Sequence, residues 1–333
     1  MRYSLAVGLV ALLVASSLTS ASAATGPAAC RDVDAPVTAL GKREVVHGTL
    51  CTPAGAATVQ LLIPGATYNS SYWDFPDGAH SFRVAQNEAG FATFTIDRLG
   101  TGRSSKPLAV TLTAFTQADV VHQVVGGLRT GAYGPRFDRV VVGGHSLGAA
   151  IAVIEAGTYR DVDGVLVTGM THRVNPPGVV GAFANFRPAN LDPKFGLLHP
   201  LGYLTTAPGS RYASFHAPGP FARRVAELEE SLKDVFSPTE AVDGLGVAVL
   251  LPYSRLITVP VLSVVGSRDS AVCGALATDC SSAEAVRAAE APYYAAPLRT
   301  FVLAGYGHSV NLAPNAGEYY SAVAEWALDE VGR

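Results

Sequence analysis

One serine in this chain stands where it could act as a nucleophile. Ser146 is the middle residue of GHSLG at positions 144–148, after the apolar run 140–143 and before a helix-forming run at 149–153. A strand, a sharp turn and a helix in this order lift a serine hydroxyl above the end of a sheet, and small flanking residues allow the turn. The alternative is a Gly-rich turn with an incidental serine. The pattern favours attack of Ser146 on an acyl carbon.

A serine hydroxyl attacks only when a base takes its proton, so a histidine is required later in the chain. The sequence has eight histidines. His308 lies in the Gly-bracketed loop 304–309, directly after the last predicted strand, and is the predicted base. We expect His145 to point away from the substrate side and to be structural. The others are expected to be packing or surface residues, or at most to line a pocket: His47, His80, His122, His172, His199 and His216.

The histidine needs a carboxylate that holds the imidazole in the correct tautomer and stabilises its positive charge. This carboxylate should lie between the serine and the histidine in the chain, directly after a strand. Asp269 ends the run VLSVVGSRD at 261–269 and is the predicted acid. The rival carboxylates either precede a strand or fall in an irregular segment: Asp161, Asp163, Asp192 and Asp243.

An oxyanion would need two backbone N–H donors. The amide of Leu147, next to the nucleophile, is the first. The loop after the predicted strand 58–63 supplies the second, because Gly65 allows the backbone to turn its amides inward. We predict the amide of Ala66, with Thr67 as the rival. Pro64-Gly65 is also an ordinary turn dipeptide.

These residues need a parallel sheet to bring them together. Short runs rich in Val, Ile and Leu alternate with helix-like stretches, which is typical of an α/β fold. The middle runs lack polar alternation, as in strands covered on both faces. Helices are predicted over 114–129 and 149–159. The predicted strands are 44–52, 58–63, 92–97, 139–143, 164–168, 259–265 and 299–303.

The regular alternation stops between residues 171 and 255, where Pro, Gly and aromatic residues are frequent. Apolar residues over 221–235 predict one helix there. Ser237-Pro238-Thr239-Glu240 predicts the start of another, with serine as N-cap and Glu240 closing a capping box. Five residues are candidate pocket residues, each also interpretable as packing or surface: Tyr68, Tyr72, Trp73, His172 and Phe215.

The N-terminus predicts export. Residues 1–23 combine Arg2, an apolar run of about ten residues and a small-residue cleavage pattern at 21–23, which is typical of a signal peptide. A membrane anchor is the alternative, but a spanning helix needs about 20 apolar residues. No later segment is predicted to span a membrane.

Four cysteines follow the predicted cleavage point, and an even number in an exported chain favours two disulfides. Four cysteines allow three connectivities, and proximity favours Cys30–Cys51 and Cys273–Cys280. The spacings resemble no zinc motif, so no metal is expected. The net charge of −3, without a Lys/Arg cluster, argues against a nucleic-acid partner.

Together these landmarks resemble the α/β-hydrolase family over nearly all of the mature chain. Ser146, Asp269 and His308 follow the family's order. DRLGTGRS at 97–104 looks like its D-x-x-G-x-G-x-S loop, and ITVPV at 257–261 looks like the entry to its acid-bearing strand. One departure is Pro64-Gly65, where the family often has His-Gly.

The resemblance implies an α/β fold with a mostly parallel central sheet flanked by helices. The hydrolase core would comprise residues 24–170 and 256–333, with a cap or lid at 171–255 inserted after the sixth strand.

The resemblance also implies a secreted, carboxylesterase-like serine hydrolase. It would cleave an ester or lactone of a small to medium, uncharged substrate through an acyl-enzyme on Ser146, without a cofactor. Serine at the turn argues against dehalogenases and epoxide hydrolases, which usually carry Asp there. The alternatives are a lipase, a peptidase or an acyltransferase with the same residues, or a binding protein on a hydrolase scaffold.

Overall fold

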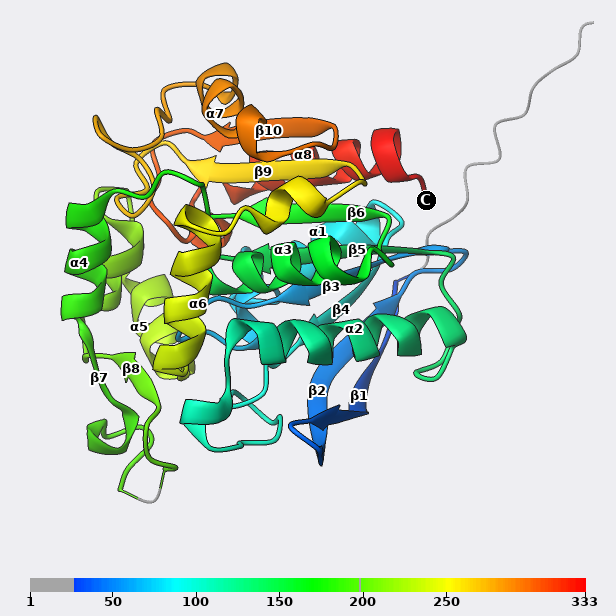
Figure 1. Cartoon of the computed structure of the whole chain (residues 1–333), viewed down its shortest axis with the longest axis horizontal. Coiled ribbons are helices and arrows are strands. Elements are labelled where there is room, and N and C mark those ends of the chain that lie inside the picture. Colours follow the sequence, from blue (N-terminus) through cyan, green and yellow to red (C-terminus); the bar gives the residue numbers. More distant parts are fainter. Residues whose placement is uncertain (1–26, 198) are drawn as a thin grey trace, which may run out of the picture.

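The structure is a computed structural model that describes residues 27–197 and 199–333. The predicted signal peptide, residues 1–23, lies outside the described residues. The centre is an eight-stranded sheet in the order β1-β2-β4-β3-β5-β6-β9-β10 (Figure 1). β2 pairs antiparallel with β1 and β4, and the other neighbours are parallel. The predicted α/β fold with a mostly parallel central sheet is confirmed.

The strand predictions agree with the structure closely where both faces of a strand are covered. β3 and β6 have the predicted bounds, and the other predicted strands differ by one or two residues at an end. β1 was not predicted, because this edge strand is largely exposed and contains Pro36 and three charged residues. The sheet strands are β1 Ala29–Ala39, β2 Lys42–Thr52, β3 Thr58–Ile63, β4 Ala92–Ile96, β5 Arg139–His145, β6 Gly164–Thr168, β9 Val261–Gly266 and β10 Leu298–Leu303.

Helices cover both faces of the sheet, so successive strand residues enter two different cores. In β5, Val140 and Val142 join the core beneath α2 and α3, whereas Val141 joins the core with Phe82 of α1 and Trp326 of α8. This double burial explains the continuous apolar runs of the middle strands. The helices of these layers are α1 Phe82–Glu88, α2 Ala114–Thr130, α3 Leu147–Tyr159, α7 Ala283–Glu290 and α8 Ala316–Trp326.

The connection between β6 and β9 lies beyond the carboxyl ends of the strands, at the left of Figure 1. It includes α4 Pro176–Ala184, β7 Phe186–Pro188, β8 Leu204–Thr206, α5 Arg223–Leu232 and α6 Pro238–Val249. α5 is shorter at both ends than the predicted helix 221–235. The predicted capping box is present, with Ser237 and Glu240 each bonding the other's backbone amide. The β7–β8 hairpin was not predicted, because three-residue strands show no alternation.

Both predicted disulfides are present. Cys30 and Cys51 are register partners in the β1–β2 pair, and their sulfurs are bonded. Cys273 and Cys280 are bonded in the loop after β9. Neither bond spans more than 21 positions, so proximity in the chain was a sufficient guide to the pairing. In the two described ranges, no helix is both long and apolar enough to cross a bilayer.

A buried carboxyl group on α3 predicts that stability depends on pH. Glu155 is fully buried, and neither of its oxygens has a hydrogen-bond partner among the described residues. Burial, and next the neighbouring Asp161, raises the pKa of Glu155 from 4.5 to about 9. The folded protein therefore keeps a proton there that the unfolded chain loses above about pH 4.5. Its contribution to stability is present at low pH and is lost as the pH rises towards 9.

Glu155→Gln mimics the protonated side chain and should flatten this pH dependence. At pH 8 we expect the variant to be more stable than the native protein by on the order of 5 kcal/mol, and at pH 4.5 to differ little. Urea unfolding at pH 4.5, 6.5 and 8.5 measures the difference. Glu325→Gln, on an exposed position of α8, is the control. Parallel pH profiles of native protein and Glu155→Gln would show that Glu155 ionises normally.

Candidate active site

Ser146 alone makes the turn between β5 and α3. Its φ is +53° and its ψ is −115°, a conformation that is rare outside glycine and costs about 1–3 kcal/mol. The Ser146 amide donates to the carbonyl of Thr168 on β6 at 2.7 Å, and the Ser146 carbonyl accepts from the amide of Ala149 at 2.9 Å. These contacts hold the strained turn at the carboxyl end of the sheet, as the nucleophile setting requires.

Two glycines allow the backbone to come close to this turn. A Cβ on Gly148 would lie 2.7 Å from the Pro64 carbonyl oxygen, too close for any side chain. A Cβ on Gly65 would lie 3.0 Å from the His145 carbonyl oxygen and 3.3 Å from the Ser146 Cβ. The loop 64–67, called the oxyanion loop below, therefore packs directly on the serine turn.

Asp269 and His308 meet across the loops that follow β9 and β10. His308 Nδ1 lies 2.7 Å from Asp269 Oδ2, and Asp269 is fully buried. Asp269 Oδ1 accepts from the Ala271 amide at 2.9 Å, while its carbonyl accepts from the amide of Cys273, a disulfide residue. An ionised Asp269 accepting from Nδ1–H would leave the other ring nitrogen of His308 free to accept a proton.

Ser146 and His308 line one cavity of about 150 Å³. In the part of the chain that the structure describes, no hydrogen bond joins the Ser146 hydroxyl to His308. Such a bond often tightens only when substrate is bound. The arrangement thus brings a serine, a histidine and a buried carboxylate to one edge of the sheet, in the order that the sequence predicted.

The oxyanion loop contributes Ala66 to the same cavity, opposite the first turn of α3. Leu147 also lines it, and the amides of Ala66 and Leu147 donate no hydrogen bond within the described ranges. Thr67, the rival donor, is fully buried with a φ of +62° and does not line the cavity. The geometry favours Ala66 over Thr67.

Two of the five candidate pocket residues, Tyr68 and Phe215, line the cavity. Tyr72 and Trp73 do not; they are buried behind it, where Trp73 packs on Phe82 with ring centroids 5.1 Å apart. His172 is also buried away from the cavity. Its Nδ1 lies 2.6 Å from Glu290 and its Nε2 2.8 Å from the Ser254 hydroxyl. The structure does not place these three residues in the cavity, because their side chains are buried elsewhere in the protein.

His145 differs from expectation, because it lines the cavity instead of pointing away from it. Its ring stacks on Tyr72 at 4.5 Å and lies 4.8 Å from the ring of His308. Nδ1 is 3.1 Å from the Thr168 hydroxyl. Burial, and next the charge that His308 can carry, holds the pKa of His145 well below its usual range. A neutral His145 beside His308 avoids a second positive charge there.

Most of the remaining lining comes from the β6–β9 connection and was missed in the sequence. These residues are small or apolar, so nothing distinguished them from core residues. No Asp, Glu, Lys or Arg lines the cavity among the described residues. Besides Phe215, the connection contributes Gly169, Met170, Thr171, Val174, Val179, Ala182, Phe183, Phe186, Ser214, Phe236, Ala241, Gly244 and Leu245.

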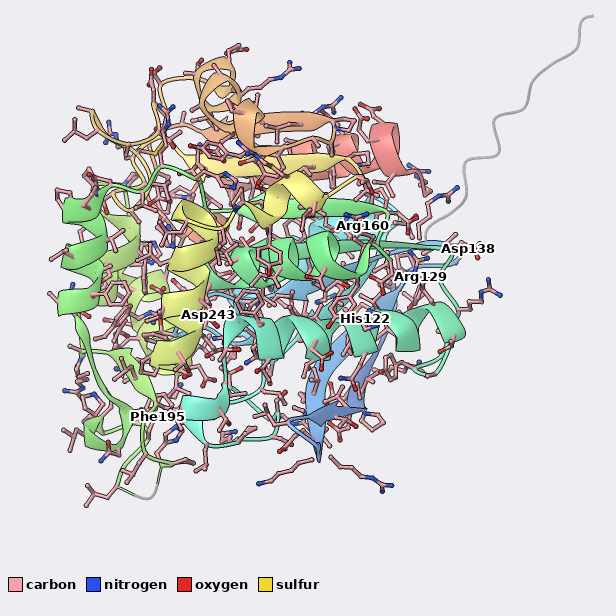
Figure 2. The ribbon with its side chains drawn as sticks, in the orientation of Figure 1. His122, Arg129, Asp138, Arg160, Phe195 and Asp243 are labelled. Atoms are coloured by element: carbon pink, nitrogen blue, oxygen red, sulfur yellow. A yellow bond between two sulfur atoms is a disulfide. The ribbon has the colours of Figure 1, made fainter. Side chains whose placement is uncertain are left out.

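One cluster among the described residues has donor atoms spaced for a metal ion. The ligand atoms of His122, Glu155 and Asp161 lie within 4.8 Å of one another. The cluster is far from the cavity: Figure 2 shows His122 on α2, well away from Asp243 on α6. His122 Nδ1 already lies 2.8 Å from Asp161, and the raised pKa of Glu155 keeps a proton on it. A protonated Glu155 is a poor metal ligand, and we assign no metal to this cluster.

The chain resembles known proteins in both sequence and structure. The sequence model described as the alpha/beta hydrolase family matches residues 60–318. No curated protein matches.

Among solved structures, a thermophilic esterase from Thermogutta terrifontis is 19% identical, with a TM-score of 0.57, and the match covers 90% of this chain and 98% of that one. The enol-lactonase from Burkholderia xenovorans is 17% identical, with a TM-score of 0.57, and covers 90% and 100%. A carboxylesterase from Bacillus subtilis is 14% identical, with a TM-score of 0.58, and covers 90% and 92%. At these identities the solved structures show a shared fold. The alpha/beta hydrolase sequence model covers well over half of the chain, and this protein therefore belongs to the alpha/beta hydrolase family.

Proposed function

We propose that this protein is a secreted serine hydrolase that cleaves a carboxylic ester or lactone of small to medium, uncharged substrates. The observation that carries the proposal is the contact of buried Asp269 with His308, which lines the same cavity as Ser146. A base held by a buried carboxylate beside a serine at a strained turn is the arrangement used for acyl transfer. The neighbouring esterase and enol-lactonase structures agree with this chemistry.

The reaction would begin with attack of the Ser146 hydroxyl oxygen on the acyl carbon, while His308 takes the hydroxyl proton. The carbonyl oxygen becomes an oxyanion that accepts from the amides of Ala66 and Leu147. Collapse of this intermediate expels the alcohol, which takes the proton from His308. Water, activated by His308, then attacks the acyl-enzyme and releases the acid.

The cavity supports the choice of substrate. A volume of about 150 Å³ suits a group of roughly benzene size, and its lining is mainly apolar. A charged acyl group would lose its hydration there without gaining a partner. We propose that residues 171–255 act as a cap, because they supply one wall of this cavity. The predicted signal peptide and the two disulfides support an oxidising compartment outside the cytoplasm.

Covalent labelling tests the proposal directly. A fluorophosphonate should react with one serine per molecule, and mass spectrometry should locate the added group on Ser146. A folded protein that does not label at Ser146 would favour a binding protein on a hydrolase scaffold. A panel of p-nitrophenyl esters, anilides and lactones, with and without added alcohol, then separates ester hydrolysis from peptidase or acyltransferase activity.

Acyl preference should depend on Phe183, which lines the cavity from α4 and is half-exposed. Phe183→Ala should raise KM for p-nitrophenyl hexanoate about 5- to 20-fold, because apolar contact worth about 1–2 kcal/mol is lost. KM for the acetate should change little. Val180→Ala, on the same helix but exposed and outside the cavity lining, is the matched control. Equal effects on both esters would place the acyl group elsewhere.

A further inference from the structure

Two buried arginines hold the oxyanion loop from the side away from the cavity, and each is paired with a carboxylate from residues 171–255. We infer that Arg98, held by Glu240, is a positioning residue that aims the Ala66 amide at the oxyanion. Arg211, held by Glu229, would secure the next part of the loop. The inference rests on the proposed function and adds a second role for the β6–β9 connection. The connection positions the oxyanion loop as well as lining the pocket.

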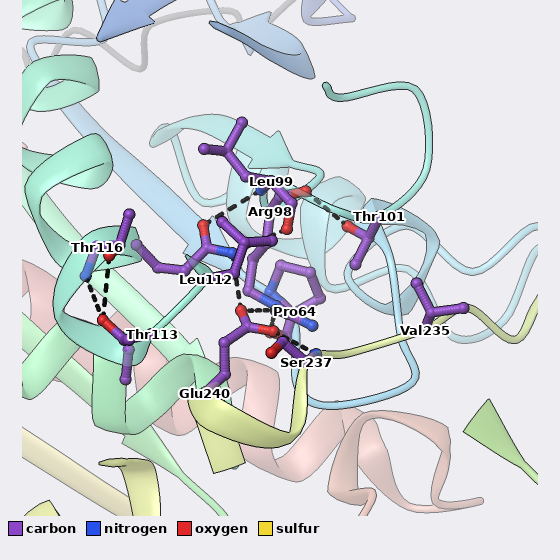
Figure 3. Close-up of polar contacts among 12 residues, drawn as sticks. Pro64, Arg98, Leu99, Thr101, Leu112, Thr113, Thr116, Val235, Ser237 and Glu240 are labelled. Carbon is purple, nitrogen blue, oxygen red and sulfur yellow. Dashed lines mark hydrogen bonds and ion pairs between the residues drawn. The ribbon is translucent and has the colours of Figure 1, made fainter. Parts of the chain in front are cut away.

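Arg98 follows β4 and reaches under the oxyanion loop. Its Nε donates to the Pro64 carbonyl at 3.1 Å and its Nη2 donates to the Gly65 carbonyl at 3.2 Å. Its Nη1 forms an ion pair with Glu240 of α6, and both side chains are 1% exposed. Figure 3 shows this arrangement, with Arg98 lying between Pro64 and Glu240. One planar guanidinium therefore connects two carbonyls of the loop to α6.

The contact of Arg98 with the Gly65 carbonyl also orients the Ala66 amide, because the two groups belong to the same peptide bond. The Gly65 carbonyl and the Ala66 N–H belong to one planar peptide unit, and in a trans peptide they point in opposite directions. Drawing the Gly65 oxygen towards Arg98 therefore directs the Ala66 N–H away from Arg98, to the side where Ala66 lines the cavity. Donors fixed before the reaction stabilise an oxyanion most, because they need no reorganisation.

Glu240 is held so firmly that it can orient Arg98. Its Oε1 accepts from Gln117 Nε2 at 2.7 Å, and its Oε2 accepts from the Ser237 amide at 2.7 Å. The second contact is half of the capping box that starts α6. The beginning of α6 is thus tied to the position of Arg98, and through it to the Ala66 amide.

Arg211 makes a second clamp, on Thr67. Its Nη1 donates to the Thr67 hydroxyl at 3.0 Å and to the Thr67 carbonyl at 3.3 Å. Its Nη2 lies 3.0 Å from Glu229 as an ion pair without hydrogen-bond alignment, and both residues are buried. Burial raises the pKa of Glu229, but the charge of Arg211 and then of His216 outweighs burial and lowers it to about 2. The pair thus stays ionised while it holds the strained backbone of Thr67.

Kinetics of two Arg98 variants test the inference. Arg98→Lys keeps a positive charge beside Glu240 but loses the planar fork that reaches both carbonyls. The double variant Arg98→Met/Glu240→Leu removes both charges together, so no lone buried charge is left to unfold the protein. For p-nitrophenyl butyrate, kcat per fluorophosphonate-labelled site should fall 10- to 100-fold in each, while KM changes less than threefold.

A transition-state mimic separates positioning from simple loss of structure. Phenylboronic acid forms a tetrahedral adduct on a serine, so its inhibition constant should weaken by about the same factor as kcat. Arg129→Lys is the matched control, because Arg129, near the end of α2, donates to the Asp161 carbonyl and pairs with Asp163, and none of the three lines the cavity. It should leave kcat, KM and boronate inhibition unchanged.

The outcomes distinguish this inference from the proposed function. If Ser146→Ala is inactive but a folded Arg98 variant keeps native kcat per labelled site, only the positioning role is wrong. If KM rises while kcat and the inhibition constant of phenylboronic acid stay unchanged, Arg98 contributes to substrate binding in the pocket and not to stabilisation of the oxyanion. If Ser146→Ala stays active, the proposed function is wrong, and the positioning role of Arg98, which rests on it, is wrong too.

Discussion

Replacing Ser146 with alanine is expected to lower kcat for short-chain aryl esters by about 10⁶-fold, which is the effect of losing a serine nucleophile. The variant keeps the turn but has no oxygen to form the acyl-enzyme. The residual rate over water would come from the oxyanion donors and binding alone. Hydrolysis of p-nitrophenyl butyrate, followed by release of p-nitrophenolate, measures the loss. Labelling by a fluorophosphonate should disappear at the same time.

Ser214→Ala is the matched control for this experiment. Ser214 also lines the cavity, and its hydroxyl accepts from Asn185 Nδ2 at 3.0 Å. We expect its kcat to change less than tenfold. Undiminished activity of Ser146→Ala would remove this residue from the mechanism, and an equal loss in both variants would point to damage to the cavity.

Asp269→Asn is expected to lower kcat by about 10⁴-fold without unfolding the protein. Asp269 Oδ2 accepts from His308 Nδ1 at 2.7 Å. An asparagine that turns its NH₂ group to His308 would favour the tautomer with the proton on Nε2, which cannot take the Ser146 proton. The carboxylate that stabilises protonated His308 would also be missing. kcat over pH 6–10 and the melting temperature give the two measurements.

The control for Asp269 lies in the disulfide loop that follows it, between Cys273 and Cys280. Asp279 is exposed, and its carboxylate accepts from the amide of the nearby Ser281. Asp279→Asn should match the native protein in kcat. Near-native activity of Asp269→Asn would mean that another group orients His308, whereas inactivity with a large fall in melting temperature would make Asp269 a structural residue.

The sequence predicted the fold and the meeting of distant residues because both follow from local patterns. Apolar runs with covered faces marked the middle strands, and the carboxyl ends of parallel strands share one edge of a sheet. Ser146, Asp269 and His308 each follow such a strand, so chain order and spacing were enough to bring them together. The edge strand β1 was not predicted, because it is largely exposed and its charged residues and Pro36 interrupt the apolar pattern.

The pocket could not be predicted in the same way. Tyr72, Trp73 and His172 are residue types that often line pockets, yet the structure buries all three within the protein and outside the cavity. Phe183 and Leu245 do line the cavity, from an irregular segment whose path no periodicity describes. His145 faces the cavity because its ring stacks on Tyr72, a contact between residues 73 positions apart.

By itself, the sequence determined the middle strands of the sheet and the order of the serine, the acid and the base, and it favoured the two disulfide pairs that the structure contains, since these depend on neighbours in the chain. Only the tertiary structure decided how the oxyanion loop is held. Arg98 and Glu240 are 142 positions apart, and Arg211 and Thr67 are 144. Charged residues are ordinarily solvent-exposed, so no local pattern marks those that fold into the interior to pair there.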